Sequence, residues 1–571
     1  MGTLGLDMDR GLFLGIDFGT TNSVVSIFDF RTGEAQTLQI DGSAIFPTAV
    51  QFEPDPEDEE KLSRVFGVQA KESAIIYPQS TVLSVKRLLG TDESIKVVVG
   101  EKEHLFTPVQ IAGEILGYLK QKADEHAQEE LGLAGEFSGC VLTVPANSTD
   151  KQKKMTKDAA VLAGFDEDSV YLRLEPAAAA ISYAINETSD KKILVYDFGG
   201  GTFDACILKV DAAGGEPSIS ILSTYGDNNL GGNDADKIVM DMIYEEFKNL
   251  TNNEIDLFDE TVDDGVSKRQ KKMALARLAQ AATQAKERLS QAKSAKVVLA
   301  PLIQEPKFVN INMEITRESF SEHKRRNALG DPQELYEKFR DKNLDDMVGD
   351  TLRCVDSSLA ACGLTEADID EVFLVGGSSA LPLVSERIKE KFGREPFKSK
   401  ISPALSISQG AAVYCEMIMM PTVKGPVVRE KTIHPLGVEL AGRRFLEIVG
   451  SGQDIPSSGL TVESSELLTT NFDNVTSMAI VVYENTSPGR GKNLSVSQVG
   501  MKRLAGASLR GIPQGPRGKE KVKVVFNVGQ DNMLKVTAKS MSVDGAVTSF
   551  PLMNYMNSGM NSGFPQCGYC E

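Results

Sequence analysis

The chain has 571 residues, of which 41% are hydrophobic and 25% are charged, the balance of an ordinary globular protein. A single hydrophobic core usually stops growing near about 250 to 300 residues, so a chain of this length predicts two or three domains. Its formal net charge of −19 makes the surface repel phosphate backbones and anionic headgroups, so neither nucleic acid nor membrane is expected as a partner.

The N-terminal segment and the cysteines predict a cytoplasmic protein. The opening MGTLGLDMDRGLFLGIDFG has no basic stretch before its short apolar run, so we expect no signal peptide and treat residues 1–11 as an extension. Seven cysteines, an odd number spread along the chain, fit free thiols in a reducing compartment. Cys567 and Cys570 form a lone CxxC, half of a zinc or redox site or incidental thiols in a tail, and we favour the tail.

Two similar strand endings predict a cleft for a polyphosphate. Residues 14–21 form an apolar strand that ends in Asp-Phe-Gly-Thr-Thr, and residues 195–202 repeat the pattern as Asp-Phe-Gly-Gly-Gly-Thr. Glycines let the backbone approach phosphate closely, and threonine hydroxyls add hydrogen-bond donors. Asp17 and Asp197 end their strands, and two carboxylates beside phosphates suit a Mg²⁺ ion that keeps most of its water ligands. The repeat predicts two related halves that face each other.

Between and after these strands, β-rich runs alternate with helical stretches, which predicts an α/β domain over residues 12–422. Residues 139–144 read as a strand followed by a helix at 150–163, and the Ala-rich residues 267–296 read as one long helix. The apolar strand that follows, at residues 372–375, ends in Gly-Gly-Ser, a turn where a nucleoside can lie against the backbone.

The chain changes in character after Pro421, because helical periodicity does not return. Residues 423–433 are expected to be a linker. Short alternating apolar runs separated by Gly, Asn, Asp and Pro predict a small all-β domain over residues 434–550. The Asn-, Ser-, Gly- and Met-rich residues 551–571 predict a disordered tail.

Several motifs resemble those of the 70-kDa heat-shock (DnaK-like) chaperones within the actin-like ATPase superfamily: GIDFGTTNS, SVKRLLG, VLTVPA, LEPAAAAISYA, YDFGGGTFD, GDNNLGGND and LVGGSSALP. The resemblance covers residues from about Leu12 to Phe550. It implies an actin-like ATPase fold with two related halves around a nucleotide cleft, followed by a β-sandwich that binds peptides. It also implies ATP and Mg²⁺ as cofactors and slow ATP hydrolysis.

The resemblance assigns roles to particular residues. It implies that Lys86 orients the attacking water, that Thr21 and Thr202 contact phosphates, and that Glu175 links the site to the domain surface. Asp17, Asp197 and Asp204 are placed around the metal and the water, the metal being held by Asp17 and Asp197 through water. The implied nucleotide-binding residues are Gly19, Thr20, Thr21, Asn22, Gly199, Gly200, Gly201, Thr202, Gly231, Gly232, Lys286, Ser290, Gly376, Gly377 and Ser378.

The resemblance also implies a groove for an apolar side chain of an extended polypeptide in the β domain. An alternative is that the same residues are only core residues of a small sandwich, since alternating apolar positions must face inward in either case. The residues concerned are Leu436, Val438, Leu440, Leu468, Met478 and Ile480.

This sequence departs from the family pattern in several places. Thr283, Glu287 and Ala380 replace residues that grip the adenosine, which predicts a weaker hold on the base. Tyr171 and Leu174 replace residues that meet J-domain co-chaperones, so that contact is in question, while a nucleotide-exchange factor stays an expected partner. The linker lacks the usual leucines, residues 323–343 read as an insertion, and the chain ends where relatives continue into a helical lid.

Three functions are compatible with these observations. The first is an ATP-driven chaperone that binds short extended apolar peptides, and the intact Lys86 and Asp17 favour it. The second is a regulatory or co-chaperone scaffold that binds ATP but hydrolyses it poorly, which the altered adenosine residues favour. The third is a small-molecule kinase of the same fold, against which the β domain and the SVKRLLG motif argue.

Overall fold

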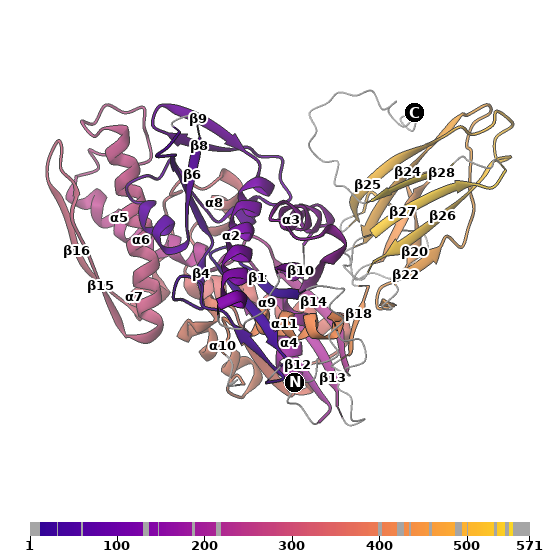
Figure 1. Ribbon diagram of the computed structural model, residues 1–571, viewed down its shortest axis with the longest axis horizontal. Helices are drawn as coiled ribbons and strands as arrows, with labels where there is room; N and C mark the ends of the chain where they lie inside the picture. The colour runs from indigo at the N-terminus through magenta and orange to yellow at the C-terminus, as the bar shows by residue number, and fades with distance from the viewer. Residues whose placement is uncertain are drawn as a thin grey trace. The chain divides into compact units, whose positions relative to one another are not determined.

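The computed structural model describes residues 12–551 apart from 31, 59–60, 130–135, 147, 185–188, 213–217, 398–401, 420–426, 433–434, 456–458, 486–493, 499–500, 530–533 and 543–546. The described residues form two compact units, a larger one that contains most residues up to Pro426 and a smaller one that consists mainly of the residues from Val427 onward (Figure 1). The expected N-terminal extension and nearly all of the expected tail lie outside the described residues. Among the helices that are described, none has both the length and the apolar character to cross a membrane.

The first half of the larger unit is built on a mixed sheet with strand order β11-β10-β1-β2-β3. β1 and β2 form an antiparallel hairpin, and β10 lies parallel to β1 on its other side. The sequence of β1, LFLGIDF, is almost entirely apolar and mostly buried, as expected for a strand covered on both faces. The strands are β1 (Leu12–Phe18), β2 (Asn22–Asp29), β3 (Glu34–Thr37), β10 (Phe137–Val144) and β11 (Val170–Leu174).

The second half repeats this plan. β12 and β13 form an antiparallel hairpin, β14 extends it, and β17 lies parallel to β12 on the other side. The repeat of Asp-Phe-Gly in the sequence therefore corresponds to a repeat of strand topology. The strands are β12 (Lys191–Phe198), β13 (Phe203–Asp211), β14 (Ser218–Asp227) and β17 (Glu371–Val375).

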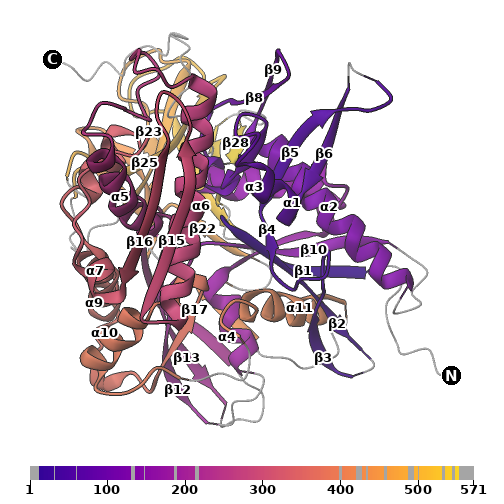
Figure 2. The same cartoon turned by 90° about the vertical axis from the view of Figure 1, so that its left-hand side faces the viewer.

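Helices α4 (Glu175–Ala184) and α11 (Ser406–Met419) lie side by side between the two sheets (Figure 2). Their contact is close because Gly410 has no side chain, and a Cβ atom there would overlap the carbonyl oxygen of Ala178. α11 packs equally closely on β1, where a Cβ atom at Gly15 would overlap the backbone of Ala412. Small residues thus let backbones meet where the two halves join.

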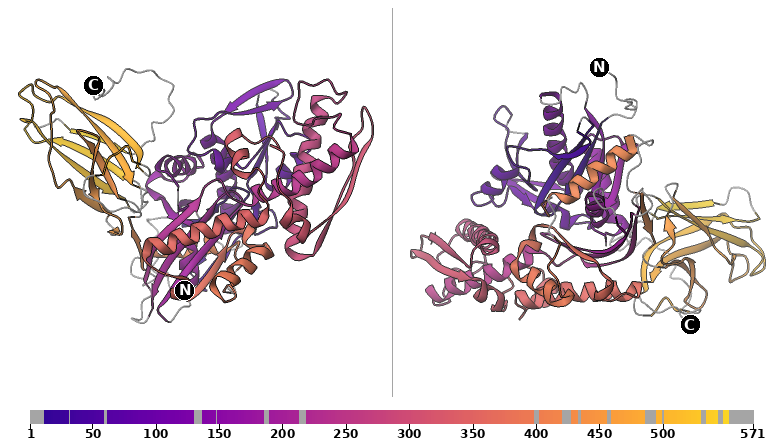
Figure 3. Two further views of the ribbon diagram at one scale, coloured as in Figure 1. Left: turned by 180° about the vertical axis from the view of Figure 1, so that it is seen from behind. Right: turned by 90° about the horizontal axis from the view of Figure 1, so that it is seen from below.

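Smaller elements extend each half. The first half adds short strands, a turn and helices: β4 (Phe46–Pro47), β5 (Ala49–Pro54), β6 (Leu62–Phe66), α1 (Gly67–Ser73), β7 (Thr81–Leu83), the 3₁₀ turn Val85–Leu88, β8 (Ile95–Val99), β9 (Lys102–Phe106), α2 (Pro108–Glu129) and α3 (Asp150–Leu162). The second half adds helices packed against a hairpin (Figures 1 and 3): α5 (Gly232–Leu250), α6 (Lys268–Gln291), β15 (Ser294–Ile303) and β16 (Val309–Thr316). The long helix predicted at 267–296 ends at Gln291, because the alternating residues after it join β15.

The segment read as an insertion folds against α5. It lies between α7 (Arg317–Glu322) and α9 (Leu344–Cys362), contains α8 (Gln333–Phe339), and α10 (Pro382–Phe392) follows further along. The guanidinium of Arg325 is fully buried and donates hydrogen bonds to the carboxylate of Asp331 and the backbone oxygen of Ala328. Burial of a cation costs much less when a carboxylate pairs with it, so the ion pair between Arg325 and Asp331 helps to hold the segment together.

The smaller unit is a two-sheet β structure, whose sheets have the strand orders β20-β19-β24-β25 and β22-β26-β27-β28. Val482 and Leu509 from the first sheet and Phe526 and Val536 from the second share one buried core. β18 (Val427–Lys431), in the expected linker, pairs with β21 (Asp454–Ile455). The other strands are β19 (Leu436–Leu440), β20 (Arg444–Val449), β22 (Leu460–Glu463), β23 (Leu468–Thr469), β24 (Ser477–Asn485), β25 (Met501–Arg510), β26 (Lys521–Val528), β27 (Leu534–Ser540) and β28 (Val547–Pro551).

Candidate functional site

The two Asp-Phe-Gly turns face each other across a cavity of about 210 Å³ in the larger unit. The turn after β1 and the turn after β12 line it together with residues from α6 and from the turn after β17. Of the nucleotide-site and catalytic residues predicted from the sequence, these line the cavity: Asp17, Gly19, Thr20, Thr21, Asn22, Lys86, Glu175, Asp197, Gly199, Gly200, Gly201, Thr202, Lys286, Ser290, Gly376, Gly377 and Ser378.

The remaining predicted residues, Asp204, Gly231 and Gly232, are not among the residues that line the cavity and support its wall instead. Asp204 is 1% exposed and lies opposite Asp197 in the β12–β13 hairpin. The backbone N–H of Gly232 donates to the oxygen of Gly199 at 2.9 Å, which fixes the glycine turn against the start of α5.

Glycines hold the two turns close together. A Cβ atom at Gly201 would lie 2.6 Å from Thr20 Oγ1, and one at Gly200 would overlap Thr21. Gly376 has a φ of +81°, and a Cβ atom there would lie 2.6 Å from Asp197 Oδ1. Any side chain at these positions would fill the space where backbone groups can approach a phosphate.

Four ionisable side chains meet in the wall of this cavity. Lys86 Nζ lies 2.6 Å from Glu175 Oε1, and the two side chains are 10% and 8% exposed. Burial and the Glu175 carboxylate raise the pKa of Asp17 to about 7. Burial and the Glu175 and Asp204 carboxylates raise the pKa of Asp197 well above its usual range. Burial alone would lower the pKa of Lys86, but the Glu175 and Asp17 carboxylates outweigh it and raise that pKa.

This donor set fits Mg²⁺. Asp197 Oδ2 is buried and has no hydrogen-bond partner among the described residues. Around it, the carboxylates of Asp17, Glu175 and Asp197 outnumber the single ammonium of Lys86. An added divalent cation would relieve this excess negative charge and favour the ionised carboxylates. Asp17 and Asp197 offer the oxygen ligands that Mg²⁺ takes alongside water and phosphate.

Hydrogen bonds join the two halves across the cavity. Arg87 Nη2 lies 2.8 Å from Asp234 Oδ2 and 3.1 Å from the backbone oxygen of Gly201. Thr21 Oγ1 donates to Asn233 Oδ1 at 3.1 Å. Asn233 and Asp234 were not predicted as site residues, although both belong to the GDNNLGGND motif, because the sequence does not show which residues they meet.

The side of the cavity assigned to the adenosine is lined by short and charged side chains. Lys286 Nζ lies 2.9 Å from Asp236 Oδ1, and Thr283 Oγ1 donates to Asp236 Oδ2 at 3.0 Å. Glu287 also lines this side, whereas no aromatic ring and no guanidinium group is found among the described lining residues. Asp236 was not predicted as a site residue, and the weak hold on the base stays a prediction.

The smaller unit has a separate cavity of about 320 Å³ beside the first residues of β24. Leu440, Leu468 and Met478, three of the six residues expected along the peptide groove, line it, and peptide binding there stays a prediction. Val438 and Ile480 are only 1% and 2% exposed and belong to the core instead. Leu436 packs against that core and does not line the cavity. Val438, Ile480 and Leu436 therefore match the alternative given above, that these positions are core residues of a small sandwich.

Charged side chains border the apolar wall of this second cavity. Glu439 and Glu466 line it with Arg444, and Leu467 and Phe472 add apolar surface, with Phe472 60% exposed. Tyr483 Oη donates to Glu439 Oε2 at 3.2 Å. The cavity therefore combines an apolar wall with two acidic groups and one basic group at its edge.

A family model described as "Hsp70 protein" matches residues 13–326 and 331–554 of the chain. The match covers well over half of the chain and includes residues of both units. This family implies an actin-like ATPase fold followed by a β-sandwich, with ATP bound together with Mg²⁺. The repeated sheets, the cavity between the two Asp-Phe-Gly turns and the two-sheet β unit are consistent with that architecture.

Proposed function

Because the chain belongs to the Hsp70 protein family, we propose that it is a chaperone that hydrolyses ATP slowly and binds short, extended, apolar peptide segments. Family membership itself suggests ATP-dependent chaperone activity. The observation that supports hydrolysis in this chain is the placement of Lys86, with Glu175, Asp17 and Asp197, in one cavity with both glycine turns.

In this proposal the glycine turns bind the phosphates. Backbone N–H groups of the turns and the hydroxyls of Thr21 and Thr202 donate hydrogen bonds to phosphate oxygens. When bound, Mg²⁺ would neutralise phosphate charge, with Asp17 and Asp197 holding it through water. Phosphoryl transfer depends mainly on positioning and charge neutralisation, and this site supplies both.

Lys86 is the residue that we assign to the hydrolytic step. Its ammonium group is held by Glu175 and points into the cavity wall that the carboxylates share. A fixed cation there orients the attacking water through a hydrogen bond and stabilises the charge that develops on the transferred phosphoryl group. Glu175 acts as a positioning residue, because it holds the ammonium group in place.

The cavity of the smaller unit is the proposed peptide site. Leu440, Leu468 and Met478 would contact an apolar side chain of the peptide. Glu439 and Glu466 would favour basic residues next to that side chain, since opposite charges at an edge select partners. J-domain co-chaperones and nucleotide-exchange factors are the further partners that the family suggests.

One experiment tests the hydrolytic part of this proposal. Steady-state ATP hydrolysis is measured on the full chain with and without an unfolded apolar peptide that carries basic flanks. We expect slow turnover that the peptide stimulates. Turnover that is indistinguishable from that of Lys86→Ala would contradict the proposal.

A second candidate is a regulatory scaffold of the same family that binds ATP but hydrolyses it poorly. The side of the cavity assigned to the base favours it, because neither an aromatic ring nor a guanidinium group is found among the described residues there. Calorimetric binding of Mg-ATP without measurable turnover would support this candidate. Turnover that a peptide stimulates would exclude it.

A further inference from the structure

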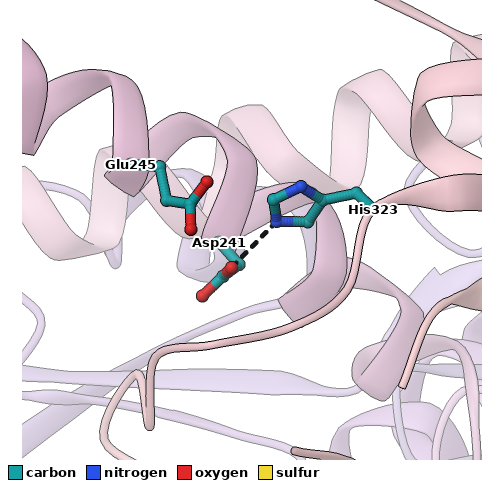
Figure 4. A group of neighbouring side chains, drawn as sticks. All are labelled: Asp241, Glu245 and His323. Atoms are coloured by element: carbon teal, nitrogen blue, oxygen red, sulfur yellow. Dashed lines mark hydrogen bonds and ion pairs between the residues drawn. The ribbon is translucent and has the colours of Figure 1, made fainter. Parts of the chain in front are cut away.

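Outside the nucleotide cavity, three side chains with metal-binding atoms converge beside α5. Asp241, Glu245 and His323 each contribute one donor atom, and these atoms all lie within 4.8 Å of one another (Figure 4). Asp241 and Glu245 are four residues apart on α5, so they project from one face of the helix. His323 follows α7 and approaches from the segment read as an insertion.

We propose that these three residues form a site for a divalent transition-metal ion of the Zn²⁺ type. One imidazole nitrogen and two carboxylate oxygens are ligands that such ions accept, whereas Mg²⁺ and Ca²⁺ take oxygen ligands. The two carboxylates balance the charge of the ion, and a water would complete the coordination. The proposal is independent of the nucleotide site and of the proposed chaperone function.

The geometry is close to that of a coordinated ion. His323 Nε2 lies 2.8 Å from Asp241 Oδ2, within the range of a hydrogen bond and also near the separation of two ligands on one ion. Two ligands about 2.1 Å from an ion lie at most about 4.2 Å apart, so closing the site needs only a small movement. The side chain of Glu245 can make this movement, because it is 29% exposed and its ion pair with Arg326 is long, at 3.6 Å.

A second layer of contacts holds Asp241 in place. Its other oxygen, Oδ1, accepts hydrogen bonds at 2.8 Å from both the backbone N–H and the side-chain amide of Asn327. Its side chain is 0% exposed, whereas that of His323 is 16% exposed, which leaves a path from solvent. Outer contacts of this kind orient a ligand and raise metal affinity.

The ion would tie the segment that follows His323 to α5. That helix begins at Gly232, beside the glycine turn of the nucleotide cavity. Metal binding is therefore expected to stabilise the contact between the segment and the helix without contributing a ligand to the nucleotide site.

The test uses Co²⁺ and Zn²⁺ on the nucleotide-free full chain carrying Cys567→Ser and Cys570→Ser, so that the C-terminal thiols bind no metal. Co²⁺ should give a visible d–d absorption band typical of nitrogen and oxygen ligands. Zn²⁺ should displace Co²⁺ at a stoichiometry of one and raise the melting temperature.

His323→Ala and Glu245→Gln should each weaken this binding at least about 100-fold. Glu246→Gln, on the next residue of α5, is the matched control and should bind like the parent.

The outcome remains decisive if one variant folds poorly. Glu245→Gln keeps the hydrogen bond between His323 and Asp241, so it should fold normally, as circular dichroism in EDTA would show. A Co²⁺ band and a zinc affinity that are the same in the parent and in folded Glu245→Gln would overturn the proposal. So would the absence of any Co²⁺ band in the parent, and the three residues would then be a hydrogen-bonded anchor of the segment.

Discussion

Arg87 Nη2 lies 2.8 Å from Asp234 Oδ2 and so connects the SVKRLLG motif of one half of the larger unit to α5 of the other. The Asp234 side chain is only 2% exposed, and its carboxylate also accepts from the backbone N–H of Gly231. The pair therefore joins the two halves of the larger unit with a charge-assisted hydrogen bond, beside the glycine turn that lines the nucleotide cavity.

We predict that Arg87→Ala accelerates release of ADP. A charge-assisted hydrogen bond contributes about 1.5 to 3 kcal/mol, which corresponds to an increase of roughly 10- to 150-fold when the bond is broken on opening of the cavity. Stopped-flow release of a fluorescent ADP analogue measures this rate. Arg269→Ala, at an exposed position at the start of α6, is the control, and equal release rates in the two variants would contradict the prediction.

Lys86→Ala should reduce ATP turnover by roughly 100- to 1000-fold while changing ATP affinity little, because a charge that acts on the transition state contributes mainly to kcat. Single-turnover hydrolysis and calorimetric binding measure the two quantities separately. The substitution also leaves Glu175 buried without its cation, so Lys86→Ala with Glu175→Gln serves as the control for folding. Equal losses of affinity and turnover would show that Lys86 acts in binding.

Asp17 predicts a pH dependence of stability in the nucleotide-free, Mg²⁺-free protein. Burial raises its pKa from 3.8 to about 7, so between these values the folded chain keeps a proton that the unfolded chain has lost. The free energy of unfolding contributed by Asp17 is therefore present below pH 3.8 and is lost as the pH rises to about 7. In urea unfolding, the parent should lose stability over this window relative to Asp17→Asn. Parallel curves for the two proteins would refute this assignment.

Met478→Ala should weaken peptide binding about tenfold, or about 1.4 kcal/mol, because the side chain forms part of the apolar wall of the cavity in the smaller unit. Fluorescence anisotropy with a labelled apolar peptide measures the affinity. Met541→Ala is the matched control, since Met541 is 56% exposed and does not line the cavity. If both variants bind like the parent, the peptide binds elsewhere.

The nucleotide site should discriminate weakly between bases. No aromatic ring or guanidinium group was found among its described lining residues, and Thr283 and Lys286 both contact Asp236. We expect ADP and GDP to differ by less than about 100-fold in Kd, or about 2.7 kcal/mol. Competition calorimetry measures the ratio, and a larger preference for ADP would mean that the base is held by contacts that form only on binding.

The part of the nucleotide site that follows a local pattern could be predicted from the sequence. Asp17 and Asp197 end similar strands, so their equivalence was visible in the Asp-Phe-Gly repeat, and the structure brings both into one cavity. The pairing of Arg87 with Asp234 was not visible, because 147 residues separate the two and only the tertiary fold brings them together.

The peptide groove shows a different limit. Alternation along β24 predicted that Met478 and Ile480 share one face, but it could not show where along the strand the core ends. Ile480 lies in the core and Met478 lies beside the cavity. Alternation along a strand determines on which face of the sheet a side chain lies. How deeply that side chain is buried depends on the sheet that packs against this face.

The contact between α4 and α11 at Gly410 has a mechanical consequence. The backbone of Gly410 lies directly against that of Ala178, so no side chain of residue 410 stands between the two helices at this point. The point where α4 crosses α11 can therefore serve as a pivot, about which the two halves of the larger unit rotate relative to each other. A rotation of a few degrees about this pivot would displace the outer parts of the two halves by several ångströms. In Gly410→Ala the added methyl group would push the two helices apart. A relative rotation of the two halves would then require the helices to separate further.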